Sequence, residues 1–154
     1  MVKEGIKAPA ITLKDQDGIK VSLSDFKGKN IVLYFYPKDN TSGCTTEACN
    51  FRDDFPKFGK LNAVIIGVSP DSVDSHKKFA AKYNLPFKLL SDEKKEVIEK
   101  YGVWKEKSMY GRKYMGVERS TFIIDKSGMV KKVFRKVKVA DHNKDVTEAL
   151  KELD

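Results

Sequence analysis

Hydrophobic positions along the chain alternate between short continuous runs and longer segments with helical spacing. The runs "NIVLYFYP" at 30–37 and "NAVIIGVSP" at 62–70 are apolar throughout. Such runs are typical of central strands that are buried on both faces. The stretch "PFKLLSD" at 86–92 predicts a third strand. Because the intervening segments are long enough for helices, the pattern predicts crossover connections between these strands.

The helical segments have recognisable ends. "CTTEACNFRDDFPKFGK" is long enough for a helix that ends by about Phe55, because Pro56 disfavours its continuation. The next segment predicts a helix with Ser69 as N-cap and Pro70 at the first helical position. "EKKEVIEKYG" predicts a short helix that ends at Gly102.

Two hairpins and a closing helix complete the pattern. "AITLKDQDGIKVSL" predicts an N-terminal hairpin around Asp17-Gly18, and "STFIIDKSGMVKKVFRKV" predicts another around Ser127-Gly128. "DVTEALKELD" places its apolar residues on one helical face. We therefore expect residues 1–154 to form one α/β domain: a mixed central sheet flanked by helices, with an N-terminal β-hairpin. This order is compatible with a thioredoxin-like fold.

Charge and composition add few constraints. The net charge of +8 suggests a polyanion partner, but the lysines are spread along the chain and interleaved with acids, and no nucleic-acid motif accompanies them. We therefore expect a solvated basic surface and no nucleic-acid partner. The charged N-terminus does not resemble a signal peptide, and no apolar window suggests a membrane span. A cytoplasmic location is the expectation.

The only two cysteines are Cys44 and Cys49. In a reducing compartment a cysteine pair is more often catalytic or metal-binding than a structural disulfide. Cys44 follows a strand and a polar turn, so it is expected in the first turn of a helix. Such positions favour anions and lower the pKa of a cysteine from about 8.5 to roughly 3.5–7.5. Cys44 is the candidate reactive thiol.

Cys49 lies five residues further along the same predicted helix. Ideal helical geometry puts the two Cα atoms about 8.6 Å apart, whereas a disulfide needs less than about 7 Å. If the two thiols pair, the first turns must unwind; otherwise Cys49 is an inert buried thiol. A metal site would need more ligands, and neither His76 nor His142 has ligand spacing. The C-x-x-C motif of dithiol oxidoreductases is absent.

The stretch "YPKDNTSGCTTEAC" resembles the P-x-x-x-T-x-x-C signature of peroxiredoxins, with Pro37, Thr41 and Cys44 in register. The second cysteine at plus five is similar to the Q-type subfamily, the bacterioferritin comigratory proteins. The likeness extends through "GVSPDSVDSHKKFAAKYNLPFKLLSD", "YGVW" and "ERSTFIIDKSG". Ser42 departs from the proline that is frequent before "GC" in the subfamily. The resemblance implies a thioredoxin-like fold and a thiol-dependent peroxidase.

The resemblance also implies a reaction cycle. Cys44 would be the peroxidatic thiolate that attacks hydrogen peroxide or an alkyl hydroperoxide and becomes a sulfenic acid. Cys49 would be the resolving thiol that forms an intramolecular disulfide with it. A thioredoxin-type donor would restore the dithiol. No metal, haem or flavin is implied, and a monomer is expected.

Four further positions carry implied roles. Arg119 would hold the thiolate and polarise the peroxide, and Thr41 would hydrogen-bond the thiolate or the peroxide. Pro37 would shield the sulfur, and Glu47 would orient the arginine. Taken alone, Arg119 is a surface cation, Thr41 a turn or cap residue, and Glu47 an acid that compensates the helix dipole.

Other interpretations stay open. The same residues would serve a redox sensor or a holdase whose oxidised, unwound form binds a partner. A general disulfide oxidoreductase is a further alternative, although the C-x-x-C motif is missing. Trp104, Met109, Tyr110 and Met115 would form an apolar rim near the site or a partner surface, but packing in the core or in a loop is the preferred expectation.

Overall fold

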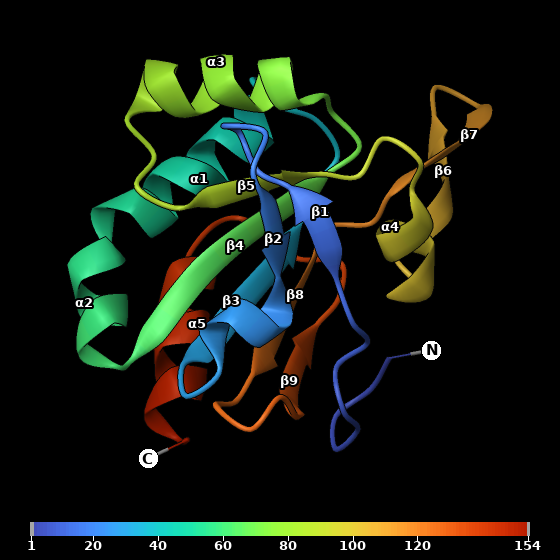
Figure 1. Cartoon of the computed structure of the whole chain (residues 1–154). Helices are drawn as coiled ribbons and strands as arrows, with labels where there is room; N and C mark the ends of the chain where they lie inside the picture. The colour runs from blue at the N-terminus through green and yellow to red at the C-terminus, as the bar shows by residue number, and fades with distance from the viewer. Residues whose placement is uncertain (1, 154) are drawn as a thin grey trace.

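The computed structural model describes residues 2–153 of the chain. Within this range the main sheet has seven strands in the order β2-β1-β5-β4-β3-β8-β9 (Figure 1). β3, β4 and β5 run parallel, whereas β1, β2, β8 and β9 join through antiparallel pairs. The predicted mixed sheet and N-terminal hairpin are therefore confirmed. The strands are β1 (Thr12–Lys14), β2 (Lys20–Ser22), β3 (Asn30–Phe35), β4 (Ala63–Ser69), β5 (Lys88–Ser91), β8 (Ser120–Ile124) and β9 (Val130–Phe134).

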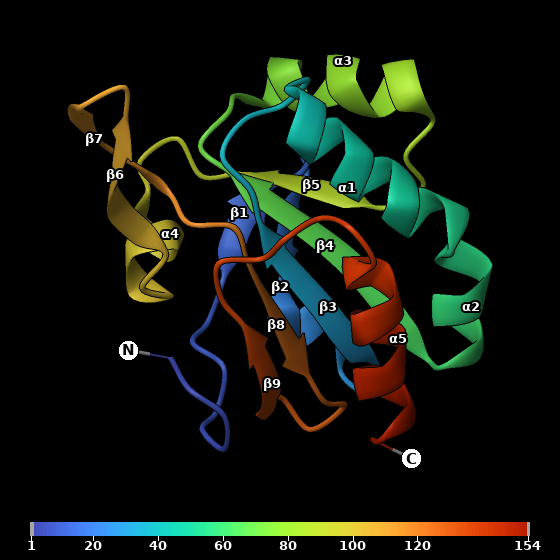
Figure 2. The ribbon, with the colours of Figure 1, turned by 180° about the vertical axis from the view of Figure 1, so that it is seen from behind.

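Helices cover both faces of this sheet. α1 (Ser42–Asp53), α2 (Phe55–Lys60), α3 (Val73–Tyr83) and α5 (His142–Lys151) contribute to one apolar layer, and α4 (Glu96–Lys100) contributes to the other. Figure 2 shows α1, α2 and α5 in front of the sheet. A short 3₁₀ helix, η1 (Leu23–Phe26), follows β2. The described residues include no helix with the length and apolar character needed to cross a membrane.

β3 is the centre of the fold, because every one of its residues is buried. Side chains on a strand point alternately to opposite faces. Leu33 and Phe35 therefore join the layer that contains α4, while Val32 and Tyr34 join the layer that contains Cys44. This double burial explains why the run reads as continuously apolar.

Pro56 does not prevent a further helix from forming directly after α1. α1 ends at Asp53, in agreement with the prediction, but α2 begins at Phe55 with the proline in its first turn. Proline is tolerated there because the first N–H groups of a helix have no intrahelical acceptor. The proline therefore separates two helices, and the second was not predicted.

The predicted start of α3 is wrong. Ser69 is the last residue of β4, and the helix begins at Val73 with Ser72 as its N-cap. The Ser72 hydroxyl accepts the backbone N–H of Ser75, which satisfies one of the free donors of the first turn. Ser69 instead donates its hydroxyl to Asp71. The end of α4 agrees more closely, since it stops two residues before Gly102.

A third hairpin was not predicted. β6 (Trp104–Met109) and β7 (Arg112–Val117) form a separate two-stranded sheet that projects beside α4 (Figures 1 and 2). Met109, Tyr110 and Met115 are exposed on it, so the preferred expectation that they pack in the core or in a loop is wrong for these three residues. Trp104 does pack against the core. The hairpin lacks the alternation of apolar and polar residues that reveals a half-buried strand.

Gly67 of β4 leaves space for the ring of Tyr34 on the neighbouring strand. A Cβ at Gly67 would lie 2.9 Å from Tyr34 Cζ and 3.0 Å from Leu89 Cδ2. We expect Gly67→Ala to lower the free energy of unfolding by about 1–3 kcal/mol, the usual cost of overpacking. Gly59→Ala is the matched control, because nothing lies within 4 Å of its Cβ position and α2 should gain roughly 0.5–1 kcal/mol. Urea unfolding that showed Gly67→Ala as stable as the wild type would contradict this.

Candidate active site

Cys44 lies in the first turn of α1, at the carboxyl end of β3. The helix begins at Ser42, and the carbonyl of its N-cap Thr41 accepts the backbone N–H of Thr45 at 2.8 Å. Cys44 is therefore the third helical residue, and it is only 2% exposed. The first-turn N–H groups of a helix lack intrahelical acceptors, so they and the helix dipole favour a negative charge at this sulfur.

Arg119 brings a cation to the sulfur from another part of the sheet. It directly precedes β8, the antiparallel neighbour of β3. Its Nη2 lies 3.2 Å from Cys44 Sγ, and its Nη1 lies 2.6 Å from Glu47 Oε1. One planar guanidinium thus bridges the thiol and the carboxylate, a geometry that the point charge of a lysine does not reproduce.

Burial and ion pairing shift the pKa values of Arg119 and Glu47 in opposite directions. Burial lowers the pKa of Arg119, but Glu47 and Cys44 raise it, so that the net shift is upward and the guanidinium stays charged. Burial raises the pKa of Glu47 to about 7, although Arg119 pulls it down. The Glu47 side chain is only 2% exposed, and its Oε2 has no hydrogen-bond partner among the described residues. For this carboxyl, desolvation outweighs the ion pair.

The raised pKa of Glu47 predicts a pH-dependent stability. The pKa rises from 4.5 to about 7 on folding, so between these values the folded state binds more protons than the unfolded state. The stability that this group contributes is complete below about pH 4.5 and is lost as the pH rises through about 7. Its full size is about 3 kcal/mol. We therefore expect Glu47→Gln to flatten the fall in unfolding free energy between pH 5 and pH 8.

Urea unfolding of the reduced protein at several pH values measures this difference. Groups remote from Glu47 titrate equally in the wild type and in Glu47→Gln, so their contribution cancels in the difference between the two curves. Parallel curves over the whole interval would show that Glu47 is ionised in the folded protein at pH 5.

Two residues near the sulfur escaped the sequence analysis. A Cβ at Gly43 would lie 3.2 Å from Arg119 Nη2, so this glycine leaves space for the guanidinium. Its position beside the reactive cysteine was the available signal. The hydroxyl of Tyr34 is buried without a partner among the described residues. Burial, followed by Glu47 and Cys44, raises the pKa of Tyr34 well above its ordinary value. Nothing in the apolar run marks this tyrosine.

The other candidate residues lie at the margin of this cluster. The hydroxyl of Thr41 donates to the Lys38 carbonyl at 2.9 Å, and its side chain is exposed. Pro37 is half-buried in the same loop. The roles foreseen for both stay predictions. Cys49 is half-buried, and both cysteines are free thiols. Because α1 is continuous from Ser42 to Asp53, the two cysteine Cα atoms are about 8.6 Å apart.

The two histidines have other partners. Burial lowers the pKa of His142 to about 4, so it is neutral at pH 7, and its Nε2 lies 2.8 Å from Thr121 Oγ1. Within residues 2–153, one cluster offers several possible metal-ligand atoms within 4.8 Å of one another, namely Asp39, Asp71 and His76. These residues form hydrogen bonds within the protein, which include a contact of 2.7 Å from His76 to Asp39.

Comparisons with known proteins agree with this geometry. The AhpC/TSA family model matches residues 5–133. Peroxiredoxin Bcp of Bacillus subtilis (strain 168) is 56% identical over 152 residues, which cover 99% of this chain and 97% of that protein. Peroxiredoxin Bcp of Escherichia coli (strain K12) is 43% identical over 151 residues, which cover 98% of this chain and 97% of that protein.

Solved structures give the same result. A mutant of Xanthomonas campestris peroxiredoxin Q superposes with a TM-score of 0.92 at 42% identity, covering 99% of this chain and 100% of the other. The bacterioferritin comigratory protein of the same species, solved in work on its alkyl peroxide reduction activity, gives 0.91 at 42% identity and covers 98% of this chain and 99% of the other. The predicted thioredoxin-like fold is confirmed. The chain belongs to the AhpC/TSA family, within it to the Bcp or Q-type peroxiredoxins, and is accordingly a peroxide-reducing enzyme that depends on a thiol reductant.

Proposed function

We propose that this peroxiredoxin reduces hydrogen peroxide and alkyl hydroperoxides with Cys44 as the nucleophile and Cys49 as the resolving thiol. The observation that carries the proposal is the 3.2 Å contact between Arg119 Nη2 and Cys44 Sγ at the first turn of α1. A thiolate there is held by a fixed cation and by free helix N–H groups. The same groups can stabilise the negative charge that develops on the peroxide oxygens as the O–O bond breaks.

The proposed cycle has three balanced steps. The Cys44 thiolate attacks the terminal peroxide oxygen, the O–O bond breaks, and a proton from solvent converts the leaving oxygen into an alcohol or water. Cys44 becomes a sulfenic acid. The Cys49 thiol then attacks this sulfur and releases water as the disulfide forms. Finally a dithiol donor transfers two electrons and two protons to the disulfide and is itself oxidised.

The second step requires α1 to open. In the described structure the two cysteines belong to one unbroken helix, and a separation of about 8.6 Å between Cα atoms exceeds the reach of a disulfide. The first turn is held by few groups, since Thr41 does not cap it with its side chain. The oxidised form in this proposal is therefore a protein whose α1 has lost its N-terminal turns.

The proposal extends to the setting of the enzyme. Residues 1–154 act as one domain and as a monomer in the cytoplasm, with a thioredoxin-type dithiol as donor and no nucleic-acid partner. Thr41 would contact the peroxide or the thiolate, and Pro37 would shield the sulfur. Thr41 is exposed at the N-terminus of α1, and in this proposal the peroxide reaches Cys44 from that side.

A redox sensor or holdase would use the same opening of α1, and turnover separates it from the enzyme. Consumption of peroxide should be coupled to NADPH oxidation through thioredoxin and thioredoxin reductase. The enzyme proposal expects many equivalents of peroxide to be reduced by each protein molecule. Oxidation that stops after one equivalent despite active thioredoxin would favour the sensor. Reduction of unrelated disulfides without peroxide would favour a general disulfide oxidoreductase.

A further inference from the structure

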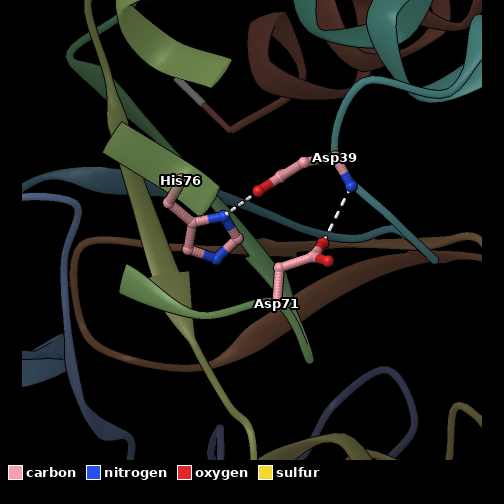
Figure 3. Close-up of side chains that lie close together, drawn as sticks. All are labelled: Asp39, Asp71 and His76. Atoms are coloured by element: carbon pink, nitrogen blue, oxygen red, sulfur yellow. Dashed lines mark hydrogen bonds and ion pairs between the residues drawn. The ribbon is translucent and has the colours of Figure 1, made fainter. Parts of the chain in front are cut away.

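The loop that leads into α1 is fastened by a buried carboxylate. Asp39 lies in this loop, and its side chain is 3% exposed. Its Oδ1 accepts the hydroxyl of Tyr36 at 2.6 Å, and its Oδ2 accepts the hydroxyl of Ser75 at 2.8 Å. His76 Nδ1 lies 2.7 Å from the same Oδ2 (Figure 3). Three donors, two of them from α3, thus converge on one carboxylate.

Both ring nitrogens of His76 face acceptor oxygens. Its Nε2 lies 3.0 Å from the carbonyl oxygen of Leu90, and a carbonyl only accepts, so Nε2 carries a proton. Its Nδ1 faces the Asp39 carboxylate, which already accepts two hydroxyl groups. His76 and Asp39 are both buried, so removing either side chain would leave the other buried without its hydrogen-bond partner.

Hydrogen bonds hold the backbone of the loop as well as the Asp39 side chain. The N–H of Asp39 donates to Asp71 Oδ2 at 2.8 Å (Figure 3), and the same oxygen accepts the Ser69 hydroxyl at 2.7 Å. The next residue, Asn40, has φ of +60°, and its side-chain oxygen accepts the hydroxyl of Tyr83 at 3.2 Å. The loop is thus attached to the end of β4 and to α3, through contacts that do not involve α1.

Asp39 is close in sequence to the groups that place the thiol. Two residues later Thr41 occupies the N-cap position of α1, and its hydroxyl donates to the Lys38 carbonyl at 2.9 Å. Cys44 follows three residues after Thr41 and contacts Arg119. Arg119 precedes β8, which pairs with the edge of β3 that lies opposite β4. A shift of this loop would change the distance between the Cys44 sulfur and the Arg119 guanidinium. The rate of reaction with peroxide is sensitive to that distance.

We propose that the buried Asp39–His76 pair is a positioning device for Cys44, which fixes the start of α1 so that sulfur and guanidinium act on one peroxide, and which stays closed when α1 opens. The inference rests on the proposed function. It makes Asp39, His76 and Tyr36 positioning residues, because among the described residues the side-chain hydrogen bond to the sulfur comes from Arg119 and from none of these three.

Two tyrosines provide a matched test. Tyr36→Phe removes a hydroxyl that donates to Asp39 at 2.6 Å, and Tyr101→Phe removes one that donates to the Pro9 carbonyl, also at 2.6 Å. Both rings are buried. Asp39→Asn is the stronger variant, since it keeps the shape of the side chain and removes the charge. Each reduced variant is mixed with hydrogen peroxide and, separately, with iodoacetamide at several pH values, and both rate constants are measured.

Iodoacetamide needs only a thiolate, whereas peroxide also needs the aligned guanidinium. We expect the peroxide rate constant to fall about tenfold or more in Asp39→Asn and severalfold in Tyr36→Phe. Alkylation should keep its pH profile and change less than about threefold. Tyr101→Phe should leave both rate constants within about twofold of the wild type, because its lost bond is equally short but does not touch the loop.

Peroxide rate constants in Asp39→Asn and Tyr36→Phe equal to the wild type would overturn the inference. A parallel fall of peroxide and alkylation rates would overturn it too, because it would assign the pair to thiol ionisation or to general stability. If Asp39→Asn does not fold, the comparison of the two tyrosine variants decides. A wild type that does not react with peroxide would instead refute the proposed function itself.

Discussion

Cys44→Ser should abolish peroxide turnover. The proposed chemistry has one nucleophile, and a serine hydroxyl at the same place is far less ionised and far less nucleophilic than a thiolate. Arg119 and the helix N–H groups would remain, but they would have no anion to hold. Removing the nucleophile from a set of residues that act together in catalysis lowers the rate by more than about 10⁴-fold. NADPH oxidation coupled through thioredoxin and its reductase measures the loss.

Cys49→Ser is the matched control for this substitution, because it replaces the other cysteine sulfur of α1 by oxygen, about 1.4 turns further along the helix. It should consume one equivalent of peroxide and then stop, since the sulfenic acid at Cys44 has no intramolecular thiol to resolve it. Mass spectrometry of that variant should find the oxygen on Cys44. Multiple turnover by Cys44→Ser would end the assignment of the nucleophile, and rapid thioredoxin-driven recycling by Cys49→Ser would end that of the resolving thiol.

Arg119→Leu should slow the oxidation of Cys44 by about 10²–10³-fold, the usual cost of removing a positioned donor from a developing charge. The guanidinium contacts both the sulfur at 3.2 Å and Glu47 at 2.6 Å. Glu47 would lose the interaction that opposes burial, so its pKa would rise further and the carboxyl would become neutral. The variant should therefore fold, and stopped-flow mixing with peroxide measures the rate.

Two further variants sharpen this prediction. Arg119→Lys keeps the charge but not the planar fork, so its rate should lie between those of the wild type and Arg119→Leu. Arg52→Leu removes another guanidinium from the same region, one that donates to the Tyr83 carbonyl at 2.8 Å and does not contact the sulfur. It should react at nearly the wild-type rate. Equal losses in Arg52→Leu and Arg119→Leu would mean that the effect comes from general destabilisation.

The elements that the sequence predicts well are those with local signals. The continuous apolar runs identify β3 and β4, because a strand buried on both faces has no polar positions. The polar turn after Pro37 and the absence of any further cysteine direct attention to Cys44 before any contact is known. The start of α1 differs from the expectation by two residues, within the usual uncertainty of helix boundaries.

Long-range contacts carry no local signal. Glu47 and Arg119 are 72 residues apart, and Asp39 and His76 are 37 residues apart. Their pairing follows from the order of strands in the sheet, which a linear pattern does not determine. His76 illustrates the difficulty: the sequence shows that it lacks metal-ligand spacing, but it does not show the carboxylate with which the buried ring pairs. The hairpin β6–β7 was missed because about half of its residues face solvent and show no regular alternation of apolar and polar positions.

The central claim is that Cys44 and Cys49 can join only when the first turns of α1 come apart. Hydrogen exchange of the reduced and the peroxide-treated protein tests it, after mass spectrometry has verified the 44–49 bond. The account predicts that amides of residues 45–50 exchange at least about tenfold faster in the oxidised protein, while those of α3 keep their protection. Equal protection of α1 in both states, with the bond present, would contradict it.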